Sequence, residues 1–370
     1  MKHKNMNQPS LRTYISYFIF NIFLVTLTSC GDFLSIEPQN DIILENYWTQ
    51  EADVNSVLNS CYAQLESTDC INRMVVWGEV RSDNMTTGVG TPYALQQVFK
   101  ENILETNTYS QWQSFYQCIN RCNTVISYAP SVNEQDPNFT DSELRATIAE
   151  ATIIRALCYF YLIRAFRAVP YVTEPSKDDS QNYQLPATSF EQILDNLIDD
   201  VERVKEDAVR SYGEKSIENT CRITRWAAYA LLADLYLWRG DWQKCIDYCD
   251  LIINQKIKEY EKEYEENPTT ITMELYGRYP LISESTSNSN YAGNPYTEIF
   301  GTGNSFESIF ELNFVNNQAI TNSTVGNFYG SRTSAQTRQI GVPTFLFEDI
   351  QTGQNKYFGK TDCRYLENMT

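Results

Sequence analysis

The side chain that most often carries catalysis near neutral pH is almost absent from this chain. Histidine occurs once in 370 residues, at His3. That residue lies in an N-terminal segment that we expect to be removed, for reasons given below. A mature chain without histidine excludes Ser-His-Asp and Cys-His catalysis and histidine-ligated zinc.

The acidic side chains leave one class of enzyme open. A glycosidase that works with two carboxylates needs no histidine, and the chain has 47 Asp and Glu residues. So many acids guarantee that some pair lies at a workable distance, and no carboxylate has a recognisable catalytic surrounding. We therefore expect a protein that is not an enzyme and needs no cofactor.

The charge balance also excludes a class of partner. The chain carries a formal net charge of −18, and removal of residues 1–29 takes away three basic and no acidic side chains. An excess of negative charge without a basic cluster repels phosphate backbones, so nucleic acid is not expected to bind.

Residues 1–29 have the three parts of a secretory signal: a basic start, an apolar run from Tyr14 to Leu27, and small residues. The apolar run has roughly 14 residues, fewer than the ~20 that a transmembrane helix needs. Leu27-Thr28-Ser29-Cys30 resembles the lipobox of bacterial lipoproteins. We expect cleavage before Cys30 and acylation of that residue, for example by palmitate, which would hold the protein on a membrane surface.

Nine cysteines follow the lipobox, an odd number that leaves at least one thiol unpaired. Two pairs stand at helical spacing: Cys118 with Cys122, and Cys245 with Cys249. This spacing puts both thiols on one helix face, but without histidine it is more typical of small buried residues than of a metal site. No metal site is expected, and a local disulfide between Cys61 and Cys70 stays open.

The elements that must position any site are mostly helices. Apolar residues recur at helical spacing, Thr140 or Asp141 and Ser189 are suitable N-caps, and Pro130 and Pro170 are expected stops. The predicted helices span 51–65, 109–128, 141–167, 189–209 and 222–256.

The last of these segments has the pattern of a tetratricopeptide hairpin centred on Gly240. The residues at the expected positions are Tyr229, Leu232, Ala233, Tyr236, Trp242 and Cys245. One such hairpin cannot bury its own apolar face, so neighbouring helices are required, and 109–128 and 141–167 are the candidates.

The amino-acid composition changes after residue 256. A charged run at 257–267 is followed by stretches rich in Ser, Asn, Gly and Thr at 283–305 and 316–341, and Phe310–Phe314 alternates like a strand. We predict a mainly α fold, with a tetratricopeptide-like scaffold over about 45–256, a loop-rich segment over about 257–370, and little strand.

Several segments, in order along the chain, resemble the SusD/RagB family, the surface glycan-binding lipoproteins of Bacteroidetes. They are Cys30 to Pro38, Trp48 with the helix around Cys61-Tyr62-Ala63, Gly78 to Asn84, Arg155 to Leu162 with Val169-Pro170, Ala230 to Ile253, and Glu307 to Glu311. No single segment is decisive, but their collinear order is specific.

The resemblance implies one domain over 30–370 that captures oligo- or polysaccharide and delivers it to a TonB-dependent, SusC-like outer-membrane transporter. It also implies a lipid-anchored protein exposed at the cell surface. Family members continue with further helices beyond the segment seen here as Asp362-Cys363-Arg364. We therefore expect that the C-terminal part of the family's core is missing from this sequence.

Sugars are held by aromatic faces and by amide or charged side chains that bond their hydroxyls. The loop residues of these types are Asn84, Tyr93, Tyr291, Asn294, Tyr296, Asn322 and Tyr329. Trp77 lies in an apolar run and is expected in the core. The alternative function is a protein-interaction scaffold on the outer membrane whose loops bind no sugar.

Overall fold

The computed structural model describes residues 47–176, 181–214, 216–268, 272–283, 295–314, 322–330 and 338–343. The signal segment, Cys30, Tyr291, Asn294 and Cys363 lie outside the described residues. The chain divides into two compact units between Tyr47 and Trp48, and the fold below is that of the second unit.

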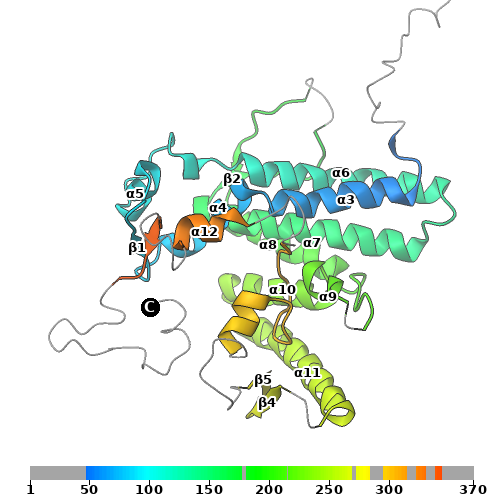
Figure 1. Cartoon of the computed structure of the whole chain (residues 1–370). Coiled ribbons are helices and arrows are strands. Elements are labelled where there is room, and N and C mark those ends of the chain that lie inside the picture. The colour runs from blue at the N-terminus through cyan, green and yellow to red at the C-terminus, as the bar shows by residue number, and fades with distance from the viewer. Residues whose placement is uncertain are drawn as a thin grey trace, which may run out of the picture. The chain divides into compact units, whose positions relative to one another are not determined.

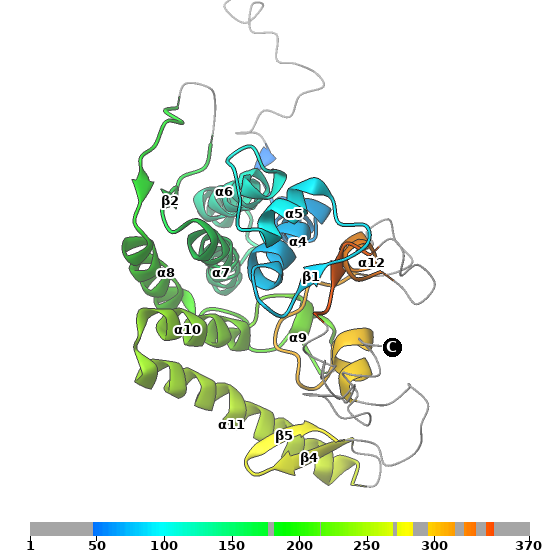
Figure 2. The same ribbon diagram turned by 90° about the vertical axis from the view of Figure 1, so that its left-hand side faces the viewer.

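Helices that follow one another in sequence pack side by side through most of the described chain. In this order α3 contacts α6, α6 contacts α7, α7 contacts α8, α8 contacts α10, and α10 contacts α11 (Figures 1 and 2). The long helices are α3 (Glu51–Leu65), α6 (Gln113–Gln135), α7 (Asp141–Phe166), α8 (Phe190–Val204), α10 (Arg225–Arg239) and α11 (Trp242–Glu266). The prediction of a mainly α, tetratricopeptide-like fold is confirmed.

Helix α7 lies at the centre of this layer. Thr140 caps it, and Glu143 returns a bond to the backbone N–H of Thr140, which completes a capping box. The helix ends at Phe166, where Arg167 adopts a φ of 67°. It is long and apolar enough to cross a membrane, but 78% of its most apolar window is buried, as in a core helix.

The predicted stop at Pro130 is wrong. Helix α6 continues through Pro130 to Gln135, although proline cannot donate a backbone hydrogen bond to the preceding turn. Ala129 and Val132, on either side of the proline, are fully buried. Their packing therefore keeps the chain helical where local propensity alone would end it.

The hairpin at Gly240 is confirmed. Gly240 takes a φ of 84°, a left-handed conformation that favours glycine, between α10 and α11. Helix α11 continues through the charged run to Glu266, so the hairpin is longer than the sequence suggested. Its principal neighbour is α8, with a smaller contribution from α7, rather than the 109–128 helix that was one of the candidates.

A buried polar cluster ties α3, α7 and the start of α10 together. The carboxylate of Glu150 accepts two hydrogen bonds from Arg222, at 3.0 and 2.8 Å, and one from the Tyr62 hydroxyl. The Tyr62 oxygen accepts the backbone N–H of Ile223 at 2.9 Å. Burial, and then the charge of Glu150, raise the pKa of Tyr62, which keeps the phenol neutral.

A second polar cluster joins α8 to the hairpin. Glu202 accepts hydrogen bonds from the hydroxyls of Tyr236 and Tyr248, both at 2.7 Å, and from Lys205. Burial raises the pKa of Glu202, but the bonds from Lys205 and the two tyrosines outweigh it, so the pKa lies below its usual value. The phenol rings of Tyr236 and Tyr248 stack with centroids 5.9 Å apart.

The described cysteines are all free. Cys61, Cys70, Cys118, Cys122 and Cys158 are fully buried, which agrees with small core residues at Cys118 and Cys122. The same expectation is wrong for the second pair, because Cys245 and Cys249 are only half-buried.

The remaining elements are short. They are α4 (Thr68–Val75), a π-helical turn (Val76–Val80), β1 (Thr86–Thr87), α5 (Tyr93–Phe99), a 3₁₀ turn (Thr108–Ser110), β2 (Val169–Pro170), β3 (Ala187–Thr188), α9 (Glu218–Cys221), β4 (Met273–Tyr276), β5 (Tyr279–Ile282), a second π-helical turn (Thr297–Thr302), α12 (Ser323–Tyr329) and β6 (Ile340–Gly341). Three antiparallel pairs form, β1–β6, β2–β3 and β4–β5.

The strand predicted at Phe310–Phe314 is wrong. Its one backbone–backbone bond among the described residues runs from the Glu311 N–H to the carbonyl of Thr220 in α9, at 2.8 Å, and it joins no ladder. Alternation of side chains is not enough for a strand when no partner edge lies beside it.

Candidate functional site

A surface that we call the loop face is made of residues from two distant parts of the sequence. One part is 79–93, and the other comprises 296–300, 322–330 and 338–343. In it β1 pairs with β6, with Thr86 opposite Gly341 and Thr87 opposite Ile340. Beyond the strands, the backbone N–H of Gly90 donates to the Arg338 carbonyl at 2.9 Å.

The close approach of these strands requires a glycine. A Cβ added at Gly88 would lie 2.3 Å from the carbonyl oxygen of Arg338, too close for any other residue. Beneath the strands, an apolar cluster unites α5, α12 and the π-helical turn that follows α4, and its centre includes Val80, Leu95 and Phe328. The loop face is thus fixed to the end of the helical layer.

Two of the predicted site residues lie together on the loop face. The Tyr329 phenol is close enough to Tyr296 and Glu79 that their charges, after the larger effect of burial, raise its pKa. The Tyr296 ring contacts Phe300 at a centroid distance of 4.9 Å, and Phe300 is 72% exposed. Phe300 was missed by sequence reasoning, although its spacing of four from Tyr296 was the available signal.

The other described candidate residues differ in exposure and in structural role. Asn84 is exposed in the turn before β1, and Tyr93, the first residue of α5, is 75% exposed. Asn322 has a local structural role, because its Oδ1 accepts the backbone N–H of Thr324 at 3.1 Å and caps α12. Trp77 packs against Phe115 at 5.0 Å, but it is only partly buried and lines a cavity, so it lies at the edge of the core rather than within it.

Two adjoining cavities lie beside the loop face. The first, of about 810 Å³, is lined by Asp83 and Glu101 among others, and the second, of about 590 Å³, by Trp77 and Tyr109. Arg81 lines both cavities. Aromatic walls with an arginine and carboxylates at the rim can hold a polyhydroxylated ligand by stacking and hydrogen bonding.

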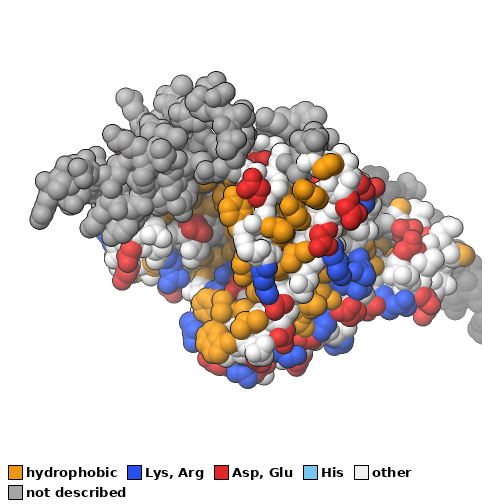
Figure 3. Space-filling view, turned by 90° about the horizontal axis from the view of Figure 1, so that it is seen from below, with side chains coloured by type: hydrophobic (Ala, Val, Ile, Leu, Met, Phe, Trp, Pro, Cys, Tyr) orange, Lys and Arg blue, Asp and Glu red, His pale blue; other side chains and the backbone are white. Residues whose placement is uncertain are grey.

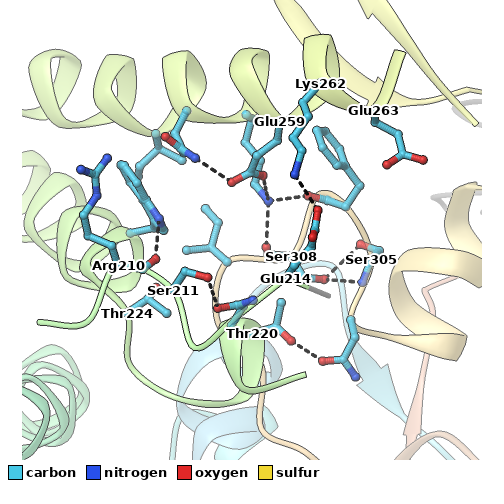
Figure 4. Close-up of a pocket in the computed structure, with 18 of the residues that line it drawn as sticks. Arg210, Ser211, Glu214, Thr220, Thr224, Glu259, Lys262, Glu263, Ser305 and Ser308 are labelled. Carbon is cyan, nitrogen blue, oxygen red and sulfur yellow. Dashed lines mark hydrogen bonds and ion pairs between the residues drawn. The ribbon is translucent and has the colours of Figure 1, made fainter. Parts of the chain in front are cut away.

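A further cavity of about 690 Å³ lies between α11 and the segment 304–309 (Figure 4). Most of its charged side chains are paired with one another or bonded to the backbone. Lys256 donates to the Phe306 carbonyl at 2.6 Å and pairs with Glu259 at 3.2 Å, while Lys262 pairs with Glu214. This arrangement fits a clamp that holds the segment against α11 better than a ligand site.

No group of three or more His, Cys, Asp or Glu side chains in the described part of the chain is arranged to hold a metal ion.

Comparison with known protein families identifies the family to which this helical architecture belongs. A SusD-like family model, described as "Starch-binding associating with outer membrane", matches residues 32–237. The chain belongs to the SusD-like family.

Two SusD-like relatives come from Formosa agariphila. SusD-like protein P38 is 29% identical over 192 residues, which cover 51% of this chain and 36% of the relative. SusD-like protein P2 is 25% identical over 243 residues, which cover 65% and 46%. The match thus takes in less than half of each relative's length.

Solved SusD superfamily structures share the fold. One from Bacteroides thetaiotaomicron has a TM-score of 0.50 at 24% identity, over 56% of this chain and 48% of that one. Another, from Bacteroides vulgatus, has a TM-score of 0.58 at 18% identity, over 82% and 63%. At these identities the likeness concerns the fold alone.

Two of the segments that resemble SusD-like proteins contribute residues with structural roles. Arg155 of α7 pairs with Asp200 of α8 at 2.8 Å and donates to Asn123 of α6 at 2.9 Å. Glu307 accepts the backbone N–H of Ile282 at 2.9 Å, which ties the β4–β5 hairpin to the 304–309 segment. Arg155 and Glu307 therefore help to hold the scaffold together.

Proposed function

We propose that the protein captures oligo- or polysaccharide at the cell surface and delivers it to a TonB-dependent, SusC-like outer-membrane transporter without cleaving it. The observation that carries the proposal is the match of residues 32–237 to a family described as starch-binding and associated with the outer membrane. The exposed ring of Phe300, beside Tyr296 and Tyr329, supports it as a place where a sugar face can stack.

The proposal includes a lipid anchor at Cys30. The lipobox-like Leu27 to Cys30 segment supports acylation, and more than one acyl chain is needed for stable attachment. A Cys30→Ala variant should lose metabolic labelling with palmitate and move from the membrane to the soluble fraction. Retention of both label and membrane association would refute the anchor.

Titration with glycans tests the binding function. The purified protein is first checked for cooperative unfolding and is then titrated with starch and laminarin, while the mixture is analysed for new reducing ends. Saturable binding without new reducing ends is expected. New reducing ends would indicate an enzyme, and the absence of binding to every glycan tested would refute capture.

A matched pair of variants locates the site. Phe300→Ala removes a ring from the loop face, and Trp242→Ala removes an equally exposed ring from α11 (72% and 63% exposed). Capture at the loop face predicts that only the first variant weakens glycan binding, by about tenfold if one stacked ring contributes ~1.4 kcal/mol. Equal affinities for the two variants would rule out this location.

One observation favours the scaffold function as a second candidate. The outer side of the hairpin exposes apolar side chains among charged ones, including Trp242, Ile246 and Leu251, and Figure 3 views the molecule from this side. Exposed apolar patches of this kind mark protein contacts. Co-purification of a membrane protein that depends on Trp242 but not on Phe300, with no glycan binding, would favour this candidate.

A further inference from the structure

A cavity distant in sequence from the loop face lies between α6 and the segment that follows α7. It has a volume of about 650 Å³, within the range of small-molecule sites. One wall is α6 together with its N-cap residue: Trp112, Tyr116 and Asn120 stand four residues apart and therefore lie along one side of the helix. The other wall consists of residues 170–176 and 181–185.

The second wall is fastened to the helices by bonds from side chains to its backbone. Tyr116 donates to the Pro170 carbonyl at 2.6 Å, and Asn123 donates to the Val172 carbonyl at 3.2 Å. The Asn120 Oδ1 accepts the Ser176 N–H at 2.7 Å. At its base, β2 pairs with β3, so both ends of this wall are held at the helical layer. The cavity is therefore largely preformed.

The cavity presents an aromatic surface. Trp112 is 38% exposed and rests edge-on against Tyr116 and Phe166, with centroid distances of 6.0 and 5.3 Å. Tyr183, on the other wall, is 58% exposed. An indole that is half exposed yet held by two rings offers a rigid apolar face, the form in which proteins stack on sugar rings.

The polar groups of the cavity suit a neutral ligand. Among the described residues, its lining includes one carboxylate, Glu174, and no lysine or arginine, in contrast to the charged cavity beside α11. Thr173 and Asn182 are exposed on the lining and offer a hydroxyl and an amide. Among the described residues, Asn120 and Asn182 use only their Oδ1 atoms in protein bonds, so both amide groups can still donate.

This cavity adjoins those at the loop face. Trp112 lines both it and the 590 Å³ cavity beneath Trp77, and Arg81 lines that one and the 810 Å³ cavity beside β1. Three cavities thus follow one another from the loop face to the 170–185 segment. Trp112 stands where the second meets the third.

We propose that the α6 cavity is a second sugar-binding subsite, in which Trp112 stacks on a neutral sugar residue of a chain that extends from the loop face. The proposal rests on the proposed glycan capture and makes the substrate class more specific: a linear, uncharged polysaccharide rather than a short or acidic sugar. A sugar bound at the loop face that is too short to extend beyond Arg81 does not contact Trp112, so Trp112 adds nothing to its affinity.

Chain length separates the two subsites. Wild-type protein and the variants Trp112→Ala, Thr173→Val and Trp242→Ala are titrated with maltoheptaose and laminariheptaose and with the matching trisaccharides. Trp112→Ala should lower the affinity for the bound heptasaccharide about tenfold and for its trisaccharide less than about twofold. Thr173→Val, which removes only an exposed hydroxyl, should lower the heptasaccharide affinity about threefold, and Trp242→Ala should leave all affinities unchanged.

The outcomes are distinguishable. Wild-type protein that binds none of these sugars refutes capture and the second subsite together. Heptasaccharide binding that falls with Phe300→Ala but not with Trp112→Ala or Thr173→Val refutes the second subsite alone. Thermal unfolding of each variant checks the fold, and if Trp112→Ala unfolds, the exposed Thr173→Val decides. An equal loss of tri- and heptasaccharide affinity in the decisive variant also overturns the extended-chain proposal.

Discussion

Replacement of Glu150 by alanine should destabilise the protein more than any exposed ion pair could. The Glu150 side chain is 5% exposed and accepts two bonds from Arg222 and one from Tyr62. Alanine leaves a guanidinium and a phenol without their acceptor. Loss of one partner of a buried pair costs about 3–5 kcal/mol, and because Arg222 is 26% exposed we expect the lower end, about 3 kcal/mol.

The matched control is the ion pair between Asp195 and Arg239, which join at 2.7 Å but are each about half exposed. Asp195→Ala should change the unfolding free energy by less than about 0.5 kcal/mol. Urea unfolding at neutral pH measures both variants, and thermal unfolding should shift by about 4–6 °C for Glu150→Ala. A Glu150→Ala cost no greater than that of Asp195→Ala would refute the assignment of this cluster as a structural tie.

A double-mutant cycle then separates the pair from the rest of the cluster. Glu150→Ala combined with Arg222→Met removes both charges, so the double variant should be more stable than the sum of the single losses predicts, by at least about 1 kcal/mol. Additive losses would mean that the two side chains act independently, against the bidentate geometry.

Three further perturbations test the loop face, the α8 cluster and the thiols. Gly88→Ala should break the β1–β6 pair and speed hydrogen exchange at the Gly90 amide. The control Gly78→Ala, whose added Cβ meets nothing within 4 Å, should leave that exchange unchanged. Equal exchange rates at Gly90 in the two variants would contradict the close approach of Gly88 to Arg338. Glu202→Gln should lower the free energy of unfolding by about 1 kcal/mol at pH 7. Because the pKa of Glu202 is lower in the folded than in the unfolded protein, the stability difference between wild type and variant, measured by urea unfolding, should shrink as the pH falls below about 4. A difference that stays constant with pH would argue against an ionised Glu202 as acceptor. Iodoacetamide labelling of the native protein, followed by peptide mass spectrometry, should modify Cys245 at least about tenfold faster than Cys122, whose pKa is raised by burial; equal rates would mean that the α6–α7 core opens readily.

The scaffold was predictable from sequence because its signals are local. The cap at Thr140, the Ala-rich run of α7 and the glycine at 240 act within a few residues, and each lies where the pattern placed it. The end of α6 was missed because tertiary burial of Val132 outweighs the helix-breaking effect of Pro130. Helix α4 is a short segment of eight residues, too brief for a period to emerge.

The candidate site was predictable only as a list of residue types. Tyr329 lies near Glu79, and β6 pairs with β1, across about 250 residues of sequence, a proximity that no local pattern encodes. Asn322 has the composition of a ligand-binding residue but caps a helix instead, since an asparagine at the start of a helix finds a backbone N–H two residues on. Trp112 falls in a helical pattern, so its exposed face was not distinguishable from a core residue.

The proposed binding groove and the hydrophobic core share the same aromatic side chains. Phe166 packs edge-on against Trp77 at 5.1 Å and against Trp112 at 5.3 Å, so one residue at the end of α7 supports two tryptophans that line the cavities. The Trp77 indole is fixed in turn by its bond to the Tyr109 carbonyl at 2.8 Å. Rings held in this way lose little conformational freedom when a ligand stacks on them, which reduces the entropic cost of binding. The end of the α6–α7 pair is therefore suited to recognition because it is part of the core.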